Sequence, residues 1–420
     1  MNPFRARIGF VATRLAGTDG VSLEAAKWAR ILTSLGHSCF AFAGASDWPP
    51  ELAYVVPEAH FEHPEVQALQ RDLFGSYRRS SQTSEVVQRL KDHLKLHLRS
   101  FISAFRLDLL IAENVLSLPM HVPLGLALTE LIAETGMPVI AHHHDFTWER
   151  ERFAINAASD YLRAAFPPGL PSIHHVVINS FAAHQLAMRT GERTTLIPNV
   201  MDFDSPPPPT TLQSAELRAA LGVGADEYLL LQPTRVVPRK RIECAIELAR
   251  RLAMPCSLVI SHAAGDEGNA YGDYLREYAE LLGVRVIFAG DRINHQPGRN
   301  AHGRAIFNLA DVYQLADLIT YPSAIEGFGN AFLEAIYYRR PIIMRDYEIF
   351  QVDIEPKGFR VLVFQDFIPA AVVEATRRVL SDPALCAEMV EQNYAIARRY
   401  YSYQVLENQL IVLMNECLGT

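Results

Sequence analysis

Short apolar runs that end in polar residues alternate with helical segments along the chain, and this alternation limits the fold more than any other feature. The runs predict strands at 7–13, 38–44, 107–113, 138–144, 174–180, 227–234, 256–261, 284–290, 317–323 and 340–345. Helical spacing follows many of them, as in residues 22–36, whose expected buried side consists of Leu23, Ala26, Ala29, Ile31 and Leu35. Strands that alternate with helices predict parallel sheets covered on both faces.

A run of four prolines at 206–209 divides this pattern in two. Consecutive prolines cannot continue a helix or a central strand, so they predict a stiff, extended connector. The 420 residues are enough for two domains, and we place the boundary between residues 204 and 205. The expected fold class is α/β, with two doubly wound domains that bind ligands outside the carboxyl ends of their strands.

The charge and the cysteines argue against several classes of protein. A formal net charge of −8 argues against a nucleic-acid-binding protein, which is usually basic. The five cysteines form no C-x-x-C pair and the N-terminus shows no signal peptide, so we expect a cytoplasmic protein. No apolar stretch approaches the roughly 18 residues that a membrane-spanning helix needs.

Residues 84–106 predict one amphipathic helix with an apolar face of Val87, Leu90, Leu94, Leu98, Phe101 and Phe105. Such a helix fits either a protein core or an anionic membrane surface. We favour the core, and peripheral membrane contact stays open as the alternative.

Charged residues follow two predicted strands in the second half. Arg235 and Lys240 lie five residues apart after one strand, and two such cations suit a diphosphate. We expect both cations to be partly exposed. Glu326 and Glu334 lie on either side of a glycine turn that leads into a helix. Such a turn lets backbone N–H groups approach an anion, and Glu334 suits a ribose diol. An ordinary acidic first helical turn gives the same pattern.

Residues 142–145 read His-His-His-Asp, which raises the question of a metal site. Successive residues of a strand face opposite sides, so only His142 and His144 share a side. Two ligands do not make a zinc site, and Asp145 would need a turn to join them. We therefore predict no metal site and interpret His144 as a functional residue. A Mg²⁺ ion is compatible with the sequence but not predicted.

Together, the stretches TRVVPRK (234–240) and EGFGNAFLE (326–334) resemble the R-x4-K and E-x7-E signatures of the retaining nucleotide-sugar glycosyltransferases of family four. Residues 17–44 and 196–202 are similar to first-domain segments of the same family. The likeness covers nearly the whole chain, although Arg241 and Val200 replace usual glycines and the stretch at 292–305 is longer. It implies the GT-B fold, in which two Rossmann-like domains face a central cleft.

The resemblance implies a role for each matching residue. Arg235 and Lys240 would hold the donor diphosphate, Glu334 the ribose and Glu326 the hydroxyls of the donor sugar. His144 would lie near the reacting sugar, so the implied catalytic set is His144, Arg235, Lys240 and Glu326. The further donor-binding residues would be Gly20, Phe328, Gly329 and Asn330, and the acceptor-side residues would be Asp19, Asp145 and Asn199. The helix at about 402–420 would pack on the first domain, and residues 205–401 would form the donor-binding domain.

The implied activity is the transfer of a hexose from a nucleotide sugar, of the GDP-mannose or UDP-glucose type, with retention of configuration. Residues 326–359 are similar to enzymes that make small soluble glycosides, so the implied acceptor is a small polar molecule such as a glycerate glycoside or a sugar phosphate. A lipid-linked or polysaccharide acceptor and a non-catalytic nucleotide-sugar-binding protein stay open. A dinucleotide-dependent dehydrogenase is disfavoured, because residues 14–20 lack the G-x-G-x-x-G spacing. We expect a monomer or a homodimer.

Overall fold

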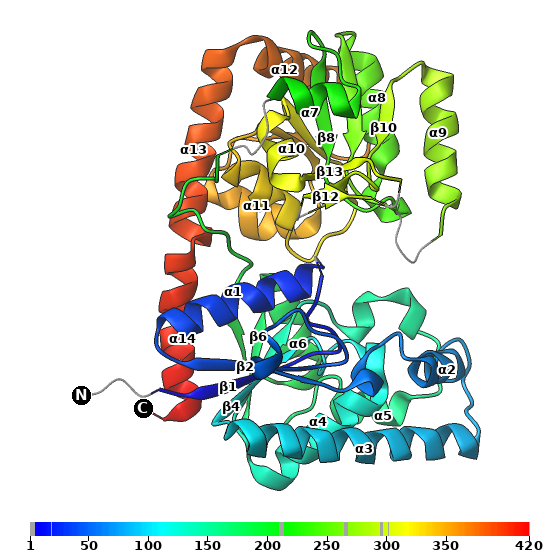
Figure 1. Cartoon of the computed structure of the whole chain (residues 1–420), viewed down its shortest axis with the longest axis vertical. Coiled ribbons are helices and arrows are strands. Elements are labelled where there is room, and N and C mark those ends of the chain that lie inside the picture. The colour runs from blue at the N-terminus through cyan, green and yellow to red at the C-terminus, as the bar shows by residue number, and fades with distance from the viewer. Residues whose placement is uncertain are drawn as a thin grey trace. The chain divides into compact units, whose positions relative to one another are not determined.

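The computed structural model describes residues 5–17, 19–209, 214–263, 268–294, 297–300 and 302–419 (Figure 1). The chain divides into two compact units. Unit 1 consists of Met1–Asn199 and Gln404–Thr420, and unit 2 consists of Val200–Tyr403. The chain therefore passes from unit 1 into unit 2 and back. Each unit is built on a parallel sheet with helices, which confirms the fold class predicted from the strand–helix alternation.

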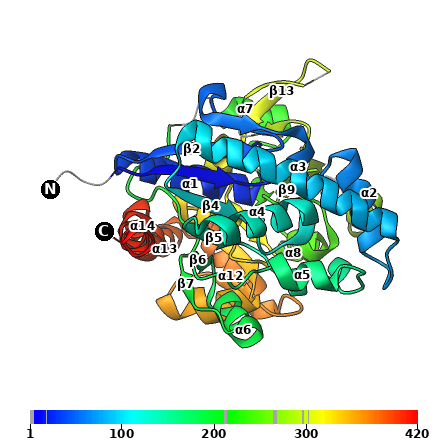
Figure 2. The same cartoon turned by 90° about the horizontal axis from the view of Figure 1, so that it is seen from below.

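Seven parallel strands form the sheet of unit 1, in the order β3-β2-β1-β4-β5-β6-β7. Their bounds, from β1 to β7, are Arg7–Val11, Ser38–Ala43, Ala53–Val55, Leu109–Glu113, Val139–His143, Ile173–Val177 and Thr194–Leu196. The labelled strands β2, β4, β5, β6 and β7 follow one another across the sheet in Figure 2. The strand order reverses between β1 and β4, and doubly wound sheets bind ligands beside the carboxyl ends at such a point.

The helices of unit 1 are α1 to α6 and α14. Their bounds, in that order, are Gly20–Ser34, Pro64–Leu73, Ser81–Phe105, Val122–Thr135, Ser159–Ala165, Ser180–Thr190 and Tyr403–Leu418. In α14 the side chains of Leu406, Leu410, Leu413 and Met414 are buried. The Gln409 side chain donates a hydrogen bond to the carbonyl of Leu196, 3.4 Å away.

The buried side of helix α1 agrees with the predicted one only in part, since Ala29 and Ile31 are buried as expected. Trp28 is buried and its ring stacks on His142, with centroids 4.3 Å apart, and Glu24 is buried as well. Ala26, which was expected inside, is exposed. An indole ring buries far more apolar area than an alanine methyl group, so residue 28 decides which side of the helix faces the sheet.

Helix α3 confirms the amphipathic prediction, and its apolar side lies in the core of unit 1. Val87, Leu90, Leu94, Leu98 and Phe101 are fully buried within the hydrophobic clusters of this unit. On its polar side, Lys91, Lys95 and Arg99 form ion pairs with two glutamates, Glu130 and Glu134, of the neighbouring helix α4 (Figure 1). Among the described residues, no helix is long and apolar enough to cross a bilayer.

Six parallel strands form the main sheet of unit 2, in the order β10-β9-β8-β14-β15-β16. Strands β8, β9 and β10 are Tyr228–Gln232, Cys256–Ile260 and Val286–Phe288, and strands β14, β15 and β16 are Leu318–Tyr321, Ile342–Arg345 and Leu362–Phe364. The strand order reverses between β8 and β14. The long polar stretch near 292–305 forms a small separate sheet of β11 (Ile293–Asn294), β13 (Ala305–Asn308) and β12 (Gly298–Arg299).

The helices of unit 2 are α7 to α13. Their bounds are Ser214–Leu221, Ile242–Leu252, Ala270–Leu282, Leu309–Leu315, Asn330–Tyr337, Ala370–Ser381 and Pro383–Tyr401. One apolar cluster joins α8, α9 and α12 to strands β8, β9, β14, β15 and β16. This core fixes the strands whose ends carry the two charged motifs.

Candidate functional site

The two charged motifs of unit 2 follow the ends of two neighbouring strands of its sheet. Strand β8 ends at Gln232 and its neighbour β14 ends at Tyr321, at the point where the strand order reverses. The backbone N–H of Ala324 donates to the carbonyl of Arg239 over 2.9 Å, which ties the loop after β14 to the loop after β8. The cations and the first glutamate therefore lie at the edge where this fold binds ligands.

Lys240 and Glu326 form a buried ion pair within these loops. Their side chains are 10% and 11% exposed, and the ammonium group also lies 5.6 Å from the centroid of the Tyr321 ring. Burial alone would raise the pKa of Glu326, but the charge and hydrogen bond of Lys240 together lower it. Burial lowers the pKa of Lys240, and the charge of Glu326 opposes that shift. The expectation of a partly exposed Lys240 is wrong, because Lys240 is buried in an ion pair with Glu326 from the loop after the neighbouring strand β14.

Arg235 is exposed, as predicted, while Val236 and Val237 after it are buried and anchor the loop. Its charge lies close enough to Lys240 to contribute to the lowered pKa of that ammonium group. The loop therefore presents one exposed and one buried cation at the same strand end.

The turn before helix α11 needs glycine at position 329. Gly329 has φ = +121°, and a Cβ atom placed there would lie 2.4 Å from the hydroxyl oxygen of Tyr347. That hydroxyl donates a hydrogen bond to the carbonyl of Phe328 over 2.7 Å. Asn330 is the first residue of α11, so the predicted donor-binding residues Phe328, Gly329 and Asn330 form one tight turn at a helix N-terminus.

Glu334 lies one turn into α11 and is half-buried. The hydroxyl of Tyr313, on helix α10, donates to its Oε2 atom over 2.6 Å. Burial and, as the second cause, the charge of Glu334 raise the pKa of Tyr313. The tyrosine hydroxyl is therefore protonated and donates this hydrogen bond. Tyr313 and Tyr347 position the motif, but the sequence carried no local signal for either.

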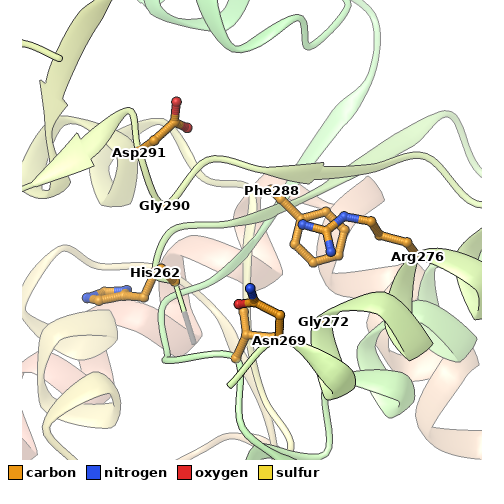
Figure 3. Close-up of a pocket in the computed structure, with 9 residues that line it drawn as sticks. His262, Asn269, Gly272, Arg276, Phe288, Gly290 and Asp291 are labelled. Carbon is orange, nitrogen blue, oxygen red and sulfur yellow. The ribbon is translucent and has the colours of Figure 1, made fainter. Parts of the chain in front are cut away.

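A pocket of about 200 Å³ opens next to the Arg235 loop in unit 2 (Figure 3). Val236 belongs both to this loop and to the pocket wall. Figure 3 shows the guanidinium group of Arg276 lying across the ring of Phe288, 4.3 Å from its centroid, with His262 and Asp291 on another side. An aromatic ring, a cation and a carboxylate around one hollow suit a planar polar ring such as a nucleobase.

The residues predicted in unit 1 lie along the carboxyl edge of its sheet. Asp19 caps α1 by accepting hydrogen bonds from the N–H groups of Val21 and Ser22, and Gly20 after it is exposed. Asp19 also pairs with Arg14 over 3.1 Å. The Asp19 carboxylate thus links Arg14 to the start of helix α1.

Two further predicted residues follow strand β5. The side-chain oxygen of Asn114 accepts hydrogen bonds from the backbone N–H groups of His144 and Asp145, over 3.0 and 3.2 Å. Asp145 pairs with Arg150 over 2.7 Å. Asn199 is buried at the last position of the first segment of unit 1.

The three histidines alternate as the strand pattern predicts. His143 faces one side, where its Nε2 atom lies 2.8 Å from Nδ1 of His175. His142 and His144 face the other side, together with Glu113 of the neighbouring strand β4. Sequence reasoning missed Glu113, although it is the polar residue that ends the apolar run 107–113.

Comparison with known proteins defines the class. Residues 213–396 match the family model described as "Glycosyl transferases group 1". The chain belongs to this family and is a hexosyltransferase, which confirms the resemblance seen in the two charged motifs.

Two similar proteins carry the same curated name. The chain is 31% identical to the mannosylglucosylglycerate synthase of Thermotoga maritima, over 96% of this chain and 98% of that one. It is 30% identical to the mannosylglucosylglycerate synthase of Petrotoga mobilis, over 84% and 86%. A solved structure with the same fold is Anabaena HepE in complex with UDP and glucose, with a TM-score of 0.67, 14% identity and coverage of 98% and 100%.

Proposed function

We propose that this hexosyltransferase moves mannose from GDP-mannose to a hydroxyl group of a small glycerate glycoside, with retention of configuration. The acceptor and the sugar are taken from the name shared by the two similar synthases. A UDP-hexose is the second candidate donor, since a protein of the same fold binds UDP.

The observation that carries the proposal is the joining of the two charged motifs at the point where the strand order of unit 2 reverses. Arg235 and Lys240 provide two cations for a diphosphate, and the turn at Gly329 adds a helix N-terminus beside them. As the bond to the sugar breaks, negative charge grows on the departing diphosphate, and fixed cations stabilise it. We assign the departing phosphate as the acceptor of the proton from the attacking hydroxyl.

The two glutamates serve different ends of the donor in this proposal. Glu334 accepts from the ribose diol, and the hydrogen bond from Tyr313 fixes the orientation of its carboxylate. Glu326, held by Lys240, accepts from hydroxyls of the transferred hexose. We place the nucleobase in the pocket lined by Phe288, Arg276 and Asp291 (Figure 3), because the Arg235 loop forms one of its walls.

The residues of unit 1 belong to the sugar and acceptor side of the proposal. His144 lies at the carboxyl end of β5 and is proposed to contact the reacting sugar, with Gly20 near the diphosphate. Asp145 and Asn199 are proposed for the acceptor. Asp19 is proposed to act indirectly, by fixing the start of helix α1 next to Gly20, because its carboxylate is engaged by the helix cap and by Arg14.

The test is a matrix of donors and acceptors with the purified protein. GDP-mannose and UDP-glucose are each combined with glucosylglycerate, glycerate and fructose 6-phosphate, and the release of nucleoside diphosphate is measured. The expected result is release from GDP-mannose that requires glucosylglycerate, with an α-configured product by NMR of its anomeric carbon. Release that requires only a sugar phosphate, or a β-configured product, would contradict the proposal.

A further inference from the structure

Three potential metal ligands converge at the carboxyl edge of the unit 1 sheet. Glu113 at the end of β4 is directly paired with His142 on β5, so their side chains leave the sheet on the same face. His144 lies two residues further on and shares that face. One ligand atom from each of the three residues lies within 4.8 Å of the other two.

Hydrogen bonding accounts for only part of this cluster. The Nε2 atom of His144 forms a hydrogen bond with Oε2 of Glu113 over 3.1 Å. The Nδ1 atom of His142 lies 3.0 Å from the same oxygen, but in a geometry that makes no hydrogen bond. Within the described part of the chain, neither ring nitrogen of His142 nor Oε1 of Glu113 has a hydrogen-bond partner, although all three atoms are buried. Buried polar atoms without partners indicate a missing water or ion.

The ligand set and its spacing suit a zinc ion. Two histidines and one glutamate are a known ligand set for Zn²⁺, which leaves a fourth position open. Ligands about 2.1 Å from a tetrahedral ion lie about 3.4 Å apart. The two nitrogen–oxygen distances of 3.0 and 3.1 Å differ from this spacing by a few tenths of an ångström. The stacked ring of Trp28 fixes the orientation of the His142 imidazole.

We propose that Glu113, His142 and His144 bind one Zn²⁺ ion per chain. The inference goes beyond the proposed function and does not depend on it, because the three residues and their spacing are the same whichever sugar the protein transfers. It replaces the prediction of no metal site, which was made from the sequence with only two candidate ligands, His142 and His144. The third ligand, Glu113, lies 29 positions before His142 on another strand. Only the pairing of β4 with β5 brings these two residues together.

The test measures zinc binding directly. Full-length protein freed of metal by chelation is titrated with ZnCl₂ by isothermal calorimetry, and with Co²⁺ to record the absorption bands of a tetrahedral ion. The expected stoichiometry is one ion per chain. Glu113→Gln and His142→Gln should each weaken binding by at least about 100-fold, since loss of an outer-shell partner alone costs 10–100-fold. The matched control is His143→Gln, which removes an adjacent buried histidine from the opposite side of the strand.

Folding of each variant is checked by circular dichroism and by thermal melting with and without Zn²⁺. Zinc should raise the melting temperature of the parent and of His143→Gln, but not of the ligand variants. If a fully buried ligand variant does not fold, His144→Gln decides the matter, because the His144 side chain is 8% exposed and its loss is better tolerated. Absence of one-to-one binding in the parent, or equal loss of binding in His143→Gln, would overturn the proposal.

Discussion

The free energy of unfolding of unit 2 should depend strongly on Lys240. The change Lys240→Met removes the ammonium group but keeps an unbranched side chain, and leaves Glu326 with 11% of its side chain exposed and no counter-charge in the pair. Breaking a buried ion pair in this way costs about 3–5 kcal/mol. Glu326 can instead lose its charge by binding a proton. For a carboxyl group of ordinary pKa (about 4.3), protonation at pH 7 costs about 3.7 kcal/mol. We therefore expect a loss of about 3–4 kcal/mol at pH 7.

The same reasoning gives the loss a pH dependence. Lys240 lowers the pKa of Glu326 in the parent protein, so the pair contributes stability above the ordinary carboxyl pKa and loses it as the pH falls. In Lys240→Met, protonation of Glu326 costs less free energy at low pH, and at pH 5 it costs only about 1 kcal/mol. The difference between variant and parent should therefore shrink by more than half between pH 7 and pH 5.

The positions of the tryptophans make the assay specific. All three, Trp28, Trp48 and Trp148, lie in unit 1, so their fluorescence reports on unit 1 while far-ultraviolet circular dichroism reports on both units. Urea unfolding of Lys240→Met should show an early transition by circular dichroism that the fluorescence does not follow.

Two further variants control the comparison. Arg235→Met removes an exposed cation from the same loop and should change the free energy of unfolding by no more than about 0.5 kcal/mol. The double change Lys240→Met with Glu326→Gln should recover most of the loss, because it removes the buried charge. A loss below about 1 kcal/mol for Lys240→Met, or an equal loss for Arg235→Met, would refute the reasoning.

Three other changes test separate parts of the structure. Glu334→Ala should weaken the binding of GDP by roughly 1.5–3 kcal/mol, because a ribose diol loses a charged acceptor; calorimetry that finds an unchanged Kd would contradict the ribose assignment. Gly329→Ala should lower stability by about 1–3 kcal/mol, since a Cβ atom at φ = +121° meets the Tyr347 hydroxyl. Tyr347→Phe in the same chain should recover part of this loss in thermal melts, and a parent-like melting temperature for Gly329→Ala alone would count against the strain. Burial lowers the pKa of His121 to about 4, so its imidazole is neutral in the folded state and stability should be lost as the pH falls below about 6.5, by about 2 kcal/mol at pH 5. His121→Gln should remove that part of the slope when urea unfolding is followed by tryptophan fluorescence at pH 7 and pH 5, and an unchanged slope would show that other groups cause it.

The fold and the charged motifs could be read from the sequence because both depend on local pattern. Apolar runs of strand length marked the strands, and strand ends are where such sheets bind ligands, so Arg235, Lys240 and Glu326 could be selected before their contact was known. The contact itself depends on β8 lying next to β14, and strand neighbours are not fixed by local spacing. Lys240 was for this reason expected to be more exposed than it is.

The remaining parts of the site depend on residues far apart in the sequence. Tyr313 reaches Glu334 from another helix, and Tyr347 reaches the Phe328 carbonyl from the loop after β15. Glu113 joins His142 only through the pairing of β4 with β5. A hydroxyl or carboxyl group that follows an apolar run looks the same in the sequence whether or not it meets such a partner.

The division of the chain has a consequence for its synthesis on the ribosome. Unit 1 begins with the first residues, yet it includes Gln404–Thr420, where Leu410 and Leu413 are buried. At roughly 5–20 residues per second, translation of the intervening segment takes on the order of tens of seconds. Throughout that time the emerging unit 1 lacks helix α14, whereas unit 2 is complete before the last helix is made. Unit 2, which is encoded later, can therefore finish folding before unit 1. Unit 1, which is encoded first, is the unit that a chaperone would have to protect until helix α14 has been made.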